Sequence, residues 1–187
     1  MLKRTILMIL LLACCLNLSA CGPSRAKQAK NLKALFPEVK QFADDNKECL
    51  QTLLVIKDRI REYNEPREER MRIKQYVITT DENQVEFAAR WCTLSPEEEL
   101  SLITEEEREL ISETILKMSY EYRSCHITQD SITITYASYG NTTLGLDNPA
   151  EEIADPGVYP GEIDFTEPVN DDWCISVLNL YPTLFGG

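Results

Sequence analysis

Four cysteines are spread along the main part of the chain, at positions 49, 92, 125 and 174. Their spacing is too wide for a CxxC metal knuckle or a thioredoxin-like redox pair. In an oxidising compartment, four cysteines could form two disulfides. The spacing leaves all three connectivities open. We favour Cys49 with Cys92 and Cys125 with Cys174, and buried free thiols are the alternative.

His126 is the only histidine of the chain and directly follows Cys125. Neighbouring side chains of a strand point to opposite faces, so these two residues cannot form a local nucleophile and base. The glycine motifs of serine hydrolases and nucleotide-binding proteins are absent. Acidic residues are abundant, so a hydrolase with paired carboxylates stays the alternative chemistry, although nothing selects a pair. We predict no catalytic residue and no cofactor.

Acidic and aromatic residues of the C-terminal third are the best candidates for contact with a partner. Four acids within nine residues do not match the spacing of an EF-hand loop, so calcium binding is only an alternative. Tyrosine is favoured at recognition surfaces because it brings large area at low entropic cost. The predicted partner-contact residues are Asp164, Glu167, Asp171, Asp172, Tyr136 and Tyr139.

Charge is segregated along the chain, whose 187 residues carry a formal net charge of −12. Residues 22–33 hold four basic residues and no acid, whereas the 64 residues after Arg123 hold ten acids and no Lys or Arg. Such an acidic field repels nucleic acid, so we exclude that class of partner. It would suit a basic protein, and a role in solubility is the alternative.

The first residues have the composition of a targeting segment. Lys3 and Arg4 precede an apolar run at 6–16, which is 11 residues long, whereas a membrane-spanning helix needs about 20. A basic start, a short apolar core and small residues after it are typical of a secretory signal peptide. The small residues are followed at once by Cys21.

Leu18-Ser19-Ala20-Cys21 resembles the lipobox of bacterial lipoproteins, over residues 1–21 alone. The resemblance implies that Cys21 is acylated and becomes the first residue of the mature protein. Two or three acyl chains hold a protein to a bilayer durably, whereas one does so marginally. Leu11-Leu12-Ala13-Cys14 is a second, poorer match, because it leaves a shorter apolar core. The basic residues after Cys21 could contact anionic headgroups or form a solvated tether.

The remaining chain alternates between helical and strand-like periodicity. Apolar residues recur every three or four positions over 37–63, which predicts one amphipathic helix. Residues 72–79 and 85–92 have the pattern of two strands of a hairpin. Ser95-Pro96-Glu97-Glu98 and Thr104-Glu105-Glu106-Glu107 are capping boxes, which predict helices at 96–103 and 105–118. The glutamates of these boxes also favour the positive ends of the helix dipoles.

A second hairpin is predicted from strands at 120–127 and 131–139, and a last strand at 173–181. Residues 140–172 have little periodicity, so we predict an irregular acidic segment there. The order of elements indicates an α+β domain with a mainly antiparallel sheet of about five strands. The long N-terminal helix and the central helical pair are expected on one face of that sheet.

The sequence therefore predicts three parts: a signal peptide at 1–20, a basic membrane-proximal tether at 21–35, and a single α+β domain at 36–187. We expect an extracytoplasmic protein attached to the cell membrane or outer membrane through lipid on Cys21. Its expected role is non-enzymatic binding of a basic exported or envelope protein. The envelope hydrolase with paired carboxylates is the alternative.

Overall fold

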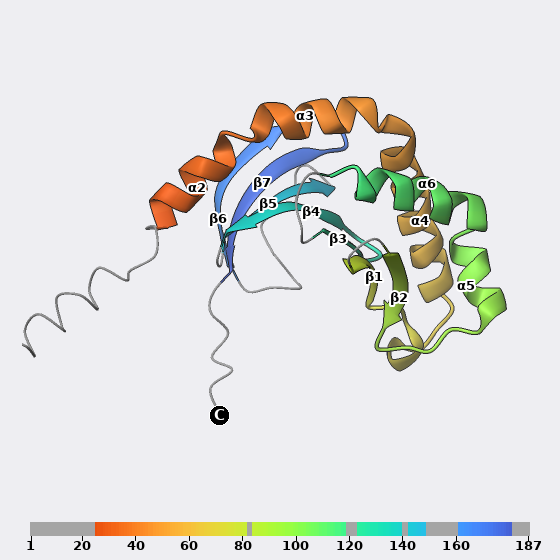
Figure 1. Cartoon of the computed structure of the whole chain (residues 1–187). Coiled ribbons are helices and arrows are strands. Elements are labelled where there is room, and N and C mark those ends of the chain that lie inside the picture. Colours follow the sequence, from red (N-terminus) through yellow and green to blue (C-terminus); the bar gives the residue numbers. More distant parts are fainter. Residues whose placement is uncertain (1–24, 82–83, 119–122, 140–141, 149–160, 181–187) are drawn as a thin grey trace, which may run out of the picture.

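The computed structural model describes residues 25–81, 84–118, 123–139, 142–148 and 161–180, with only the backbone at 25–26, 81, 161–164 and 179–180. These residues form an α+β structure in which helices pack on a curved antiparallel sheet (Figure 1). The sheet has seven strands in the order β2-β1-β3-β4-β5-β7-β6. The α+β class, the antiparallel sheet and its helical layer agree with the prediction, whereas the expected number of about five strands is wrong.

The strands are β1 (Gln75–Asp81), β2 (Gln84–Arg90), β3 (Ser124–Ile127), β4 (Ile132–Tyr139), β5 (Thr142–Asn148), β6 (Gly161–Pro168) and β7 (Cys174–Leu180). The β1–β2 and β3–β4 hairpins and strand β7 confirm the predicted positions. Strands β5 and β6 lie inside the segment that was predicted to be irregular, and residues 149–160 of that segment lie outside the described part.

Strand β5 was missed because its sequence contains residues typical of turns, such as Gly145, Asp147 and Asn148. At Gly145 an added Cβ would lie 3.0 Å from the Asp147 carboxylate, so a larger residue there would require this side chain to shift. Strand β6 ends in Pro168 and shifts register between Ile163 and Phe165, which hides its alternation. Both strands are held by their partners in the sheet rather than by local sequence preference.

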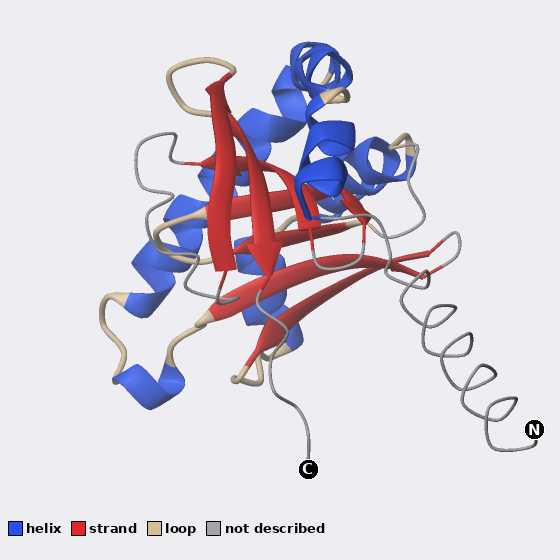
Figure 2. Cartoon of the chain, turned by 90° about the vertical axis from the view of Figure 1, so that its left-hand side faces the viewer, coloured by secondary structure: helices blue, strands red, loops and turns tan. Residues whose placement is uncertain are grey.

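One face of the sheet carries all the helices that the structure describes. Helices α2 (Arg25–Lys33) and α3 (Phe36–Asp45) cross the half formed by β4 to β7, and α4 (Lys47–Asn64), α5 (Pro96–Leu102) and α6 (Glu105–Leu116) cover the other half (Figures 1 and 2). The core lies between these layers and is continuous from Leu32 in α2 to Ile111 in α6. We call the opposite side of the sheet the helix-free face.

Helix α2 lies within the predicted tether at 21–35, of which residues 21–24 are outside the described part. Ala29 and Leu32 of α2 are 3% and 0% exposed and belong to the core. Gln28 accepts a hydrogen bond from the Thr142 hydroxyl of β5 at 3.0 Å, and the Lys33 ammonium lies 4.6 Å from the centre of the Phe165 ring. The basic segment from Arg25 onward is therefore part of the folded domain.

The predicted helix over 37–63 is divided into α3 and α4 at Asn46. The backbone of Asn46 leaves the helical region at φ −120° and ψ 31°. Its side chain donates a hydrogen bond to the Phe42 carbonyl at 2.7 Å, which competes with the regular helical hydrogen bonds. The break lets α3 follow the curved sheet while α4 turns toward β1 (Figure 1).

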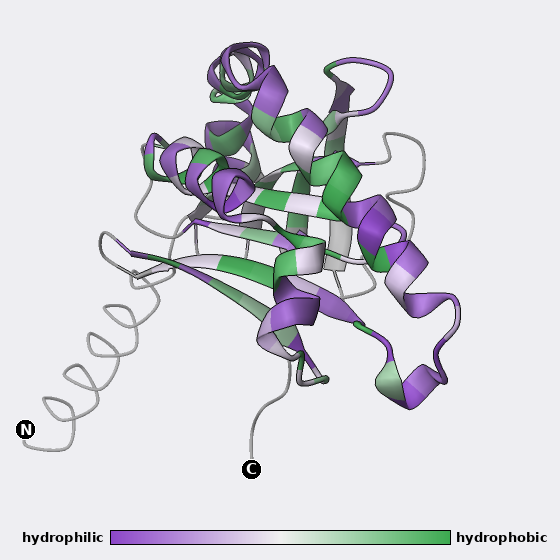
Figure 3. Ribbon diagram, turned by 90° about the vertical axis from the view of Figure 1, so that its right-hand side faces the viewer, coloured by the Kyte–Doolittle hydropathy of each residue, from purple (hydrophilic) through white to green (hydrophobic). Residues whose placement is uncertain are grey.

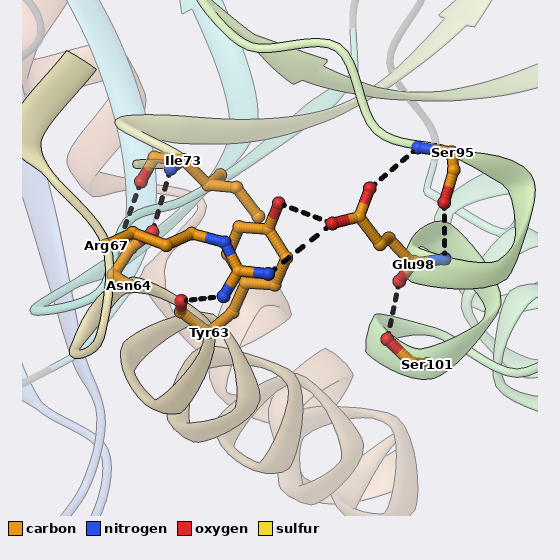
Figure 4. A network of polar contacts seen from close by, with 7 residues as sticks. All are labelled: Tyr63, Asn64, Arg67, Ile73, Ser95, Glu98 and Ser101. Atoms are coloured by element: carbon orange, nitrogen blue, oxygen red, sulfur yellow. Dashed lines mark hydrogen bonds and ion pairs between the residues drawn. The ribbon is translucent and has the colours of Figure 1, made fainter. Parts of the chain in front are cut away.

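A polar network fixes the end of α4 against β1 and α5 (Figure 4). The buried Asn64 donates to the Ile73 carbonyl at 2.9 Å and accepts from the Ile73 N–H at 2.8 Å. Glu98 of α5 accepts from the Tyr63 hydroxyl at 3.1 Å and pairs with Arg67 at 3.4 Å. Glu98 also closes the capping box with Ser95, as predicted. The network therefore joins the end of α4 both to the segment that leads into β1, nine residues later, and to α5, 35 residues later.

Candidate interaction surface

The helix-free face carries polar side chains from adjacent strands in matched register. One row runs through His126, Thr133, Asp147 and Cys174, and a second runs through Ser124, Thr135, Gly145 and Ser176. These side chains include a carboxyl, a thiol, an imidazole and hydroxyls, which are the groups that could support catalysis.

Asp147 is the buried carboxyl of this face and is only 7% exposed. The Ser176 hydroxyl donates a hydrogen bond to it, and Thr133 also contacts it. Burial raises the pKa of Asp147 to about 6, which exceeds the opposing effect of these two hydroxyls. Burial and the nearby Asp147 raise the pKa of the Cys174 thiol to about 12. A thiol held in its protonated form is a poor nucleophile.

His126 is engaged separately from Asp147. Its Nδ1 lies 3.0 Å from Gln75 Nε2, and its Nε2 lies 3.1 Å from Ser124 Oγ. Burial, together with Arg90, lowers the pKa of the imidazole, which favours its neutral form. Strand β4 separates His126 from Asp147, which places them about 10 Å apart at the usual strand spacing. They therefore do not form a hydrogen-bonded catalytic pair.

The six residues predicted to contact a partner do not form one surface. Tyr136 alternates with Ile132 and Ile134 on the helix side, so it is 3% exposed and donates to Glu38 at 2.9 Å. Its ring meets Phe42 edge to face at 5.5 Å. Tyr139 is 45% exposed at the end of β4. The predicted recognition pair is thus divided between the core and the surface.

Of the four predicted acids, the three with described side chains lie at the β6–β7 turn, far from Tyr139. Glu167 of β6 forms an ion pair with Lys40 of α3 at 2.5 Å. Asp171 and Asp172 are exposed in the β6–β7 turn, about 20 Å along the sheet from Tyr139 at the usual rise per residue. The side chain of Asp164 lies outside the described part. No group of three or more metal-ligating side chains occurs among the described residues.

The four domain cysteines are free thiols in the structure, so neither predicted disulfide is present. Cys125 faces the helical layer, Cys174 lies on the helix-free face, and β4 and β5 separate their strands. Cys49 is in the first turn of α4, whereas Cys92 lies near Tyr63 in its last turn, about 21 Å along the helix. A disulfide requires Cα atoms within about 7 Å, so this fold does not permit either pair.

A different surface, formed by α5 and α6, concentrates unpaired negative charge. Residues 96–116 contain eight glutamates and one arginine. Three glutamates are used internally: Glu98 contacts Arg67, Glu99 contacts Arg108, and Glu107 contacts Arg59. The other five are exposed and have no ion-pair partner among the described residues: Glu97, Glu105, Glu106, Glu109 and Glu113. We call these five residues the acidic surface.

The acidic surface was not selected from the sequence because capping explains most glutamates of this stretch. Glu105 and Glu106 do lie in the first turn of α6, where negative charge stabilises the helix. Glu109 and Glu113 lie beyond that turn, so capping does not account for them. With Glu105 they are spaced four residues apart, which places all three on one side of α6. That spacing was the signal available in the sequence.

The acidic surface lies far from the basic helix α2. Helix α2 is at one end of the molecule and α5 and α6 are at the other (Figure 1). Lys27, Lys30 and Lys33 of α2 are exposed, and α2 contains no acid. Hydrophilic residues predominate on the outer turns of the helices near the acidic end (Figure 3). The exposed lysines of α2 and the exposed glutamates of the acidic surface therefore lie at opposite ends of the described part.

Cys21, the predicted lipid site, lies outside the described residues. Among the described helices, none is both long and apolar enough to span a bilayer. Comparison with family models, with curated proteins and with solved structures finds no match to this chain.

Proposed function

We propose that the chain is a lipid-anchored, non-enzymatic binding protein on the extracytoplasmic side of a bacterial cell membrane or outer membrane. The Leu18-Ser19-Ala20-Cys21 sequence supports the anchor, since it resembles a lipobox. The signal peptide would leave with residues 1–20. Helix α2 begins only four residues after Cys21, so the folded domain would lie close to the bilayer.

The observation that carries this proposal is that the exposed lysines of α2 and the acidic surface lie at opposite ends of the described part. The exposed lysines of α2 would face anionic headgroups, and each basic residue near such a surface contributes about 1 kcal/mol. The acidic surface at the opposite end would then point away from the bilayer. A bilayer of the same sign would repel it, whereas a basic partner would be attracted. The acidic surface is therefore the binding surface, and its partner is a basic exported or envelope protein.

The alternative of a hydrolase with paired carboxylates receives less support. It requires a carboxyl with a raised pKa, which Asp147 provides. It also requires a second carboxyl about 5 to 9.5 Å away. The pKa of Asp147 is raised by burial, and its polar contacts among the described residues are the hydroxyls of Ser176 and Thr133. A binding function explains why the five glutamates of the acidic surface are exposed and unpaired. A hydrolase built around the buried Asp147 does not explain them.

Capture of basic proteins by matched charge variants tests the proposal. The form beginning after Cys21 is immobilised and exposed to envelope extract of its own organism at low and high salt. Neutralising three acidic-surface residues by Glu105→Gln, Glu109→Gln and Glu113→Gln should reduce capture of a basic protein about tenfold, at about 0.5 kcal/mol for each exposed contact. High salt should have the same effect, because exposed charges are screened beyond about 8 to 10 Å.

The control removes three charges from the β3–β4 and β6–β7 turns, outside the acidic surface, by Asp130→Asn, Asp171→Asn and Asp172→Asn. These residues are also exposed, so the control matches the change in net charge. It should leave capture within about twofold of the unmodified chain. Equal capture by both variants, or capture that salt does not weaken, would contradict the proposal.

A further inference from the structure

Strand β2 is an edge of the sheet and its outer side is not paired with any described strand. It pairs with β1 over seven consecutive residues without a register shift, and it contains no proline. The opposite edge, β6, has a register shift between Ile163 and Phe165 and ends in Pro168. Bulges and prolines are devices that prevent an edge from accepting another strand. Strand β6 has them, and β2 does not.

The core is open along β2. On the helix side of this strand, Val85, Phe87 and Ala89 pack against the core but remain half-buried. The β1 counterparts of Ala89 and Phe87 are Tyr76 and Ile78, which are completely buried between β2 and β3, whereas Thr80, the counterpart of Val85, is half-buried. A further strand next to β2 would cover the half-buried row in the same way. Burial of apolar area would add to the backbone hydrogen bonds of such a strand.

Trp91 marks the end of this edge. It directly follows β2, is 70% exposed, and has a φ of 64°. A positive φ is rare for a bulky residue and costs about 1 to 3 kcal/mol. The conformation turns the chain away from the strand direction and leaves the indole in solvent. Tryptophan is the residue type most often found as an energetic anchor of interfaces.

The charges around the edge indicate the chemistry of its occupant. Arg108 of α6 lies over Phe87, 4.9 Å from the ring centre, so this residue of α6 reaches the helix side of β2. Glu105 is a neighbour of Arg108 on the helix surface, one turn earlier, and Glu109 directly follows it. Glu86 is exposed on the strand itself. A second copy of this chain would bring two acidic surfaces together, whereas a basic segment would be attracted.

We propose that the basic partner binds by strand addition, with an extended segment of alternating apolar and basic residues pairing with the free edge of β2. This inference rests on the proposed binding function and names how the partner is recognised. Apolar side chains of the segment cover Val85, Phe87 and Ala89, and Trp91 contacts its end. Its basic side chains alternate with the apolar ones, so they lie on the helix-free face, where β2 exposes Glu86 and Arg90. The acidic surface, on the helix side, attracts the positively charged segment as a whole.

A heptapeptide of alternating lysine and valine, blocked at both ends, is the probe. Its length matches the seven residues of β2. Binding to the full mature chain is followed by tryptophan fluorescence, which reports on Trp91 because the other tryptophan, Trp173, is 1% exposed. Alternate amides of a strand point to opposite edges, so the peptide is also made with N-methyl groups on its valine amides or on its lysine amides.

We expect at least one methylated peptide to bind about tenfold more weakly, since methylation removes backbone donors without changing charge. Hydrogen exchange of β2 amides should slow when the unmodified peptide binds. Both methylated peptides binding within about twofold of the parent, or no binding of the parent at millimolar concentration, would overturn strand addition. The acidic surface could still bind a basic protein in that case. The experiment therefore tests strand addition separately from the proposed binding function.

Trp91→Gly separates binding from folding at this edge. Glycine accepts a positive φ without strain, so the variant should be at least as stable as the parent chain. It should nevertheless bind the heptapeptide about fivefold more weakly, measured by calorimetry because the fluorescent residue is lost. Unchanged peptide affinity would remove Trp91 from the proposal. If the parent chain forms a dimer and the Trp91→Gly variant does not, the occupant of the β2 edge is a second copy of the chain instead.

Discussion

Asp147 shows how a single buried carboxyl couples this fold to pH. The group is held between strands by the Ser176 hydroxyl, and Gly145 leaves the space that it needs. Burial raises its pKa from an ordinary value of 3.8 to about 6. Between these two values the unfolded chain releases a proton that the folded chain retains. The contribution of Asp147 to stability therefore falls as pH rises through this window.

Asp147→Asn should remove this dependence on pH. A shift of about two pKa units corresponds to about 3 kcal/mol, so the variant should gain up to that much stability relative to the parent between pH 4 and 7. Urea unfolding at several pH values measures the difference. Asp171→Asn is the control, because Asp171 is exposed in a turn. A difference between Asp147→Asn and the parent that stays constant over this range would show that Asp147 ionises normally.

The cysteines make a second prediction for single residues. Cys49, Cys125 and Cys174 are 2%, 0% and 2% exposed, and burial raises the pKa of each thiol. Cys92 is the partly exposed thiol. In the form that begins after Cys21, one thiol should react with a chromogenic disulfide reagent in the native state, and four should react in denaturant without reductant. Cys92→Ser should abolish the native reaction. Fewer than four reactive thiols after denaturation would show that the protein contains a disulfide.

Most elements of the fold could be predicted because their local signals agree with their tertiary setting. The capping boxes at Ser95 and Thr104 are formed as expected, and the β1–β2 and β3–β4 hairpins follow from alternation. Helix α2 could not be predicted, since only Ala29 and Leu32 of its nine residues are apolar and buried. Strand β5 depends on neighbours on both sides, which a local pattern does not reveal.

The candidate surface was harder to predict than the fold. Charge alone indicated the C-terminal acids, but Glu167 is neutralised by Lys40, a residue 127 positions earlier in the chain. The same long-range pairing leaves Glu105, Glu109 and Glu113 free while Glu107 is bound to Arg59. Contacts between elements distant in sequence decide which acidic residues form ion pairs and which do not. The four-residue spacing of Glu105, Glu109 and Glu113 could indicate that they share one side of a helix. It could not indicate that they lack ion-pair partners among the described residues.

Leu32→Ala tests whether α2 belongs to the domain. Leu32 is fully buried, so truncation should lower the free energy of unfolding by about 2 to 5 kcal/mol. Lys30→Ala, on the exposed side of the same helix, should change it by less than about 0.5 kcal/mol. Both values come from urea unfolding of the form that begins after Cys21. Equal stability of the two variants would return residues 25–33 to the role of a tether.

At the scale of the whole molecule, the basic helix α2 lies close in sequence to the predicted lipid site, and the acidic surface lies at the opposite end of the described part. Lipid attachment would fix the basic end to the bilayer, so that both the acidic surface and the edge of β2 are presented to exported proteins. Neither α2 nor the acidic surface by itself determines how the molecule is oriented at the bilayer. Attachment at Cys21 is therefore the premise on which the orientation of the binding surface depends.

Membrane retention of two cysteine variants tests this premise most directly. Each variant is expressed in a bacterial host that acylates lipoproteins, and membranes are separated from the other fractions and washed in high salt. Cys21→Ser should move the protein out of the membrane fraction or leave it uncleaved, whereas Cys14→Ser should remain membrane-bound, cleaved and acylated. Retention and acylation of Cys21→Ser at the level of the parent chain would contradict the account.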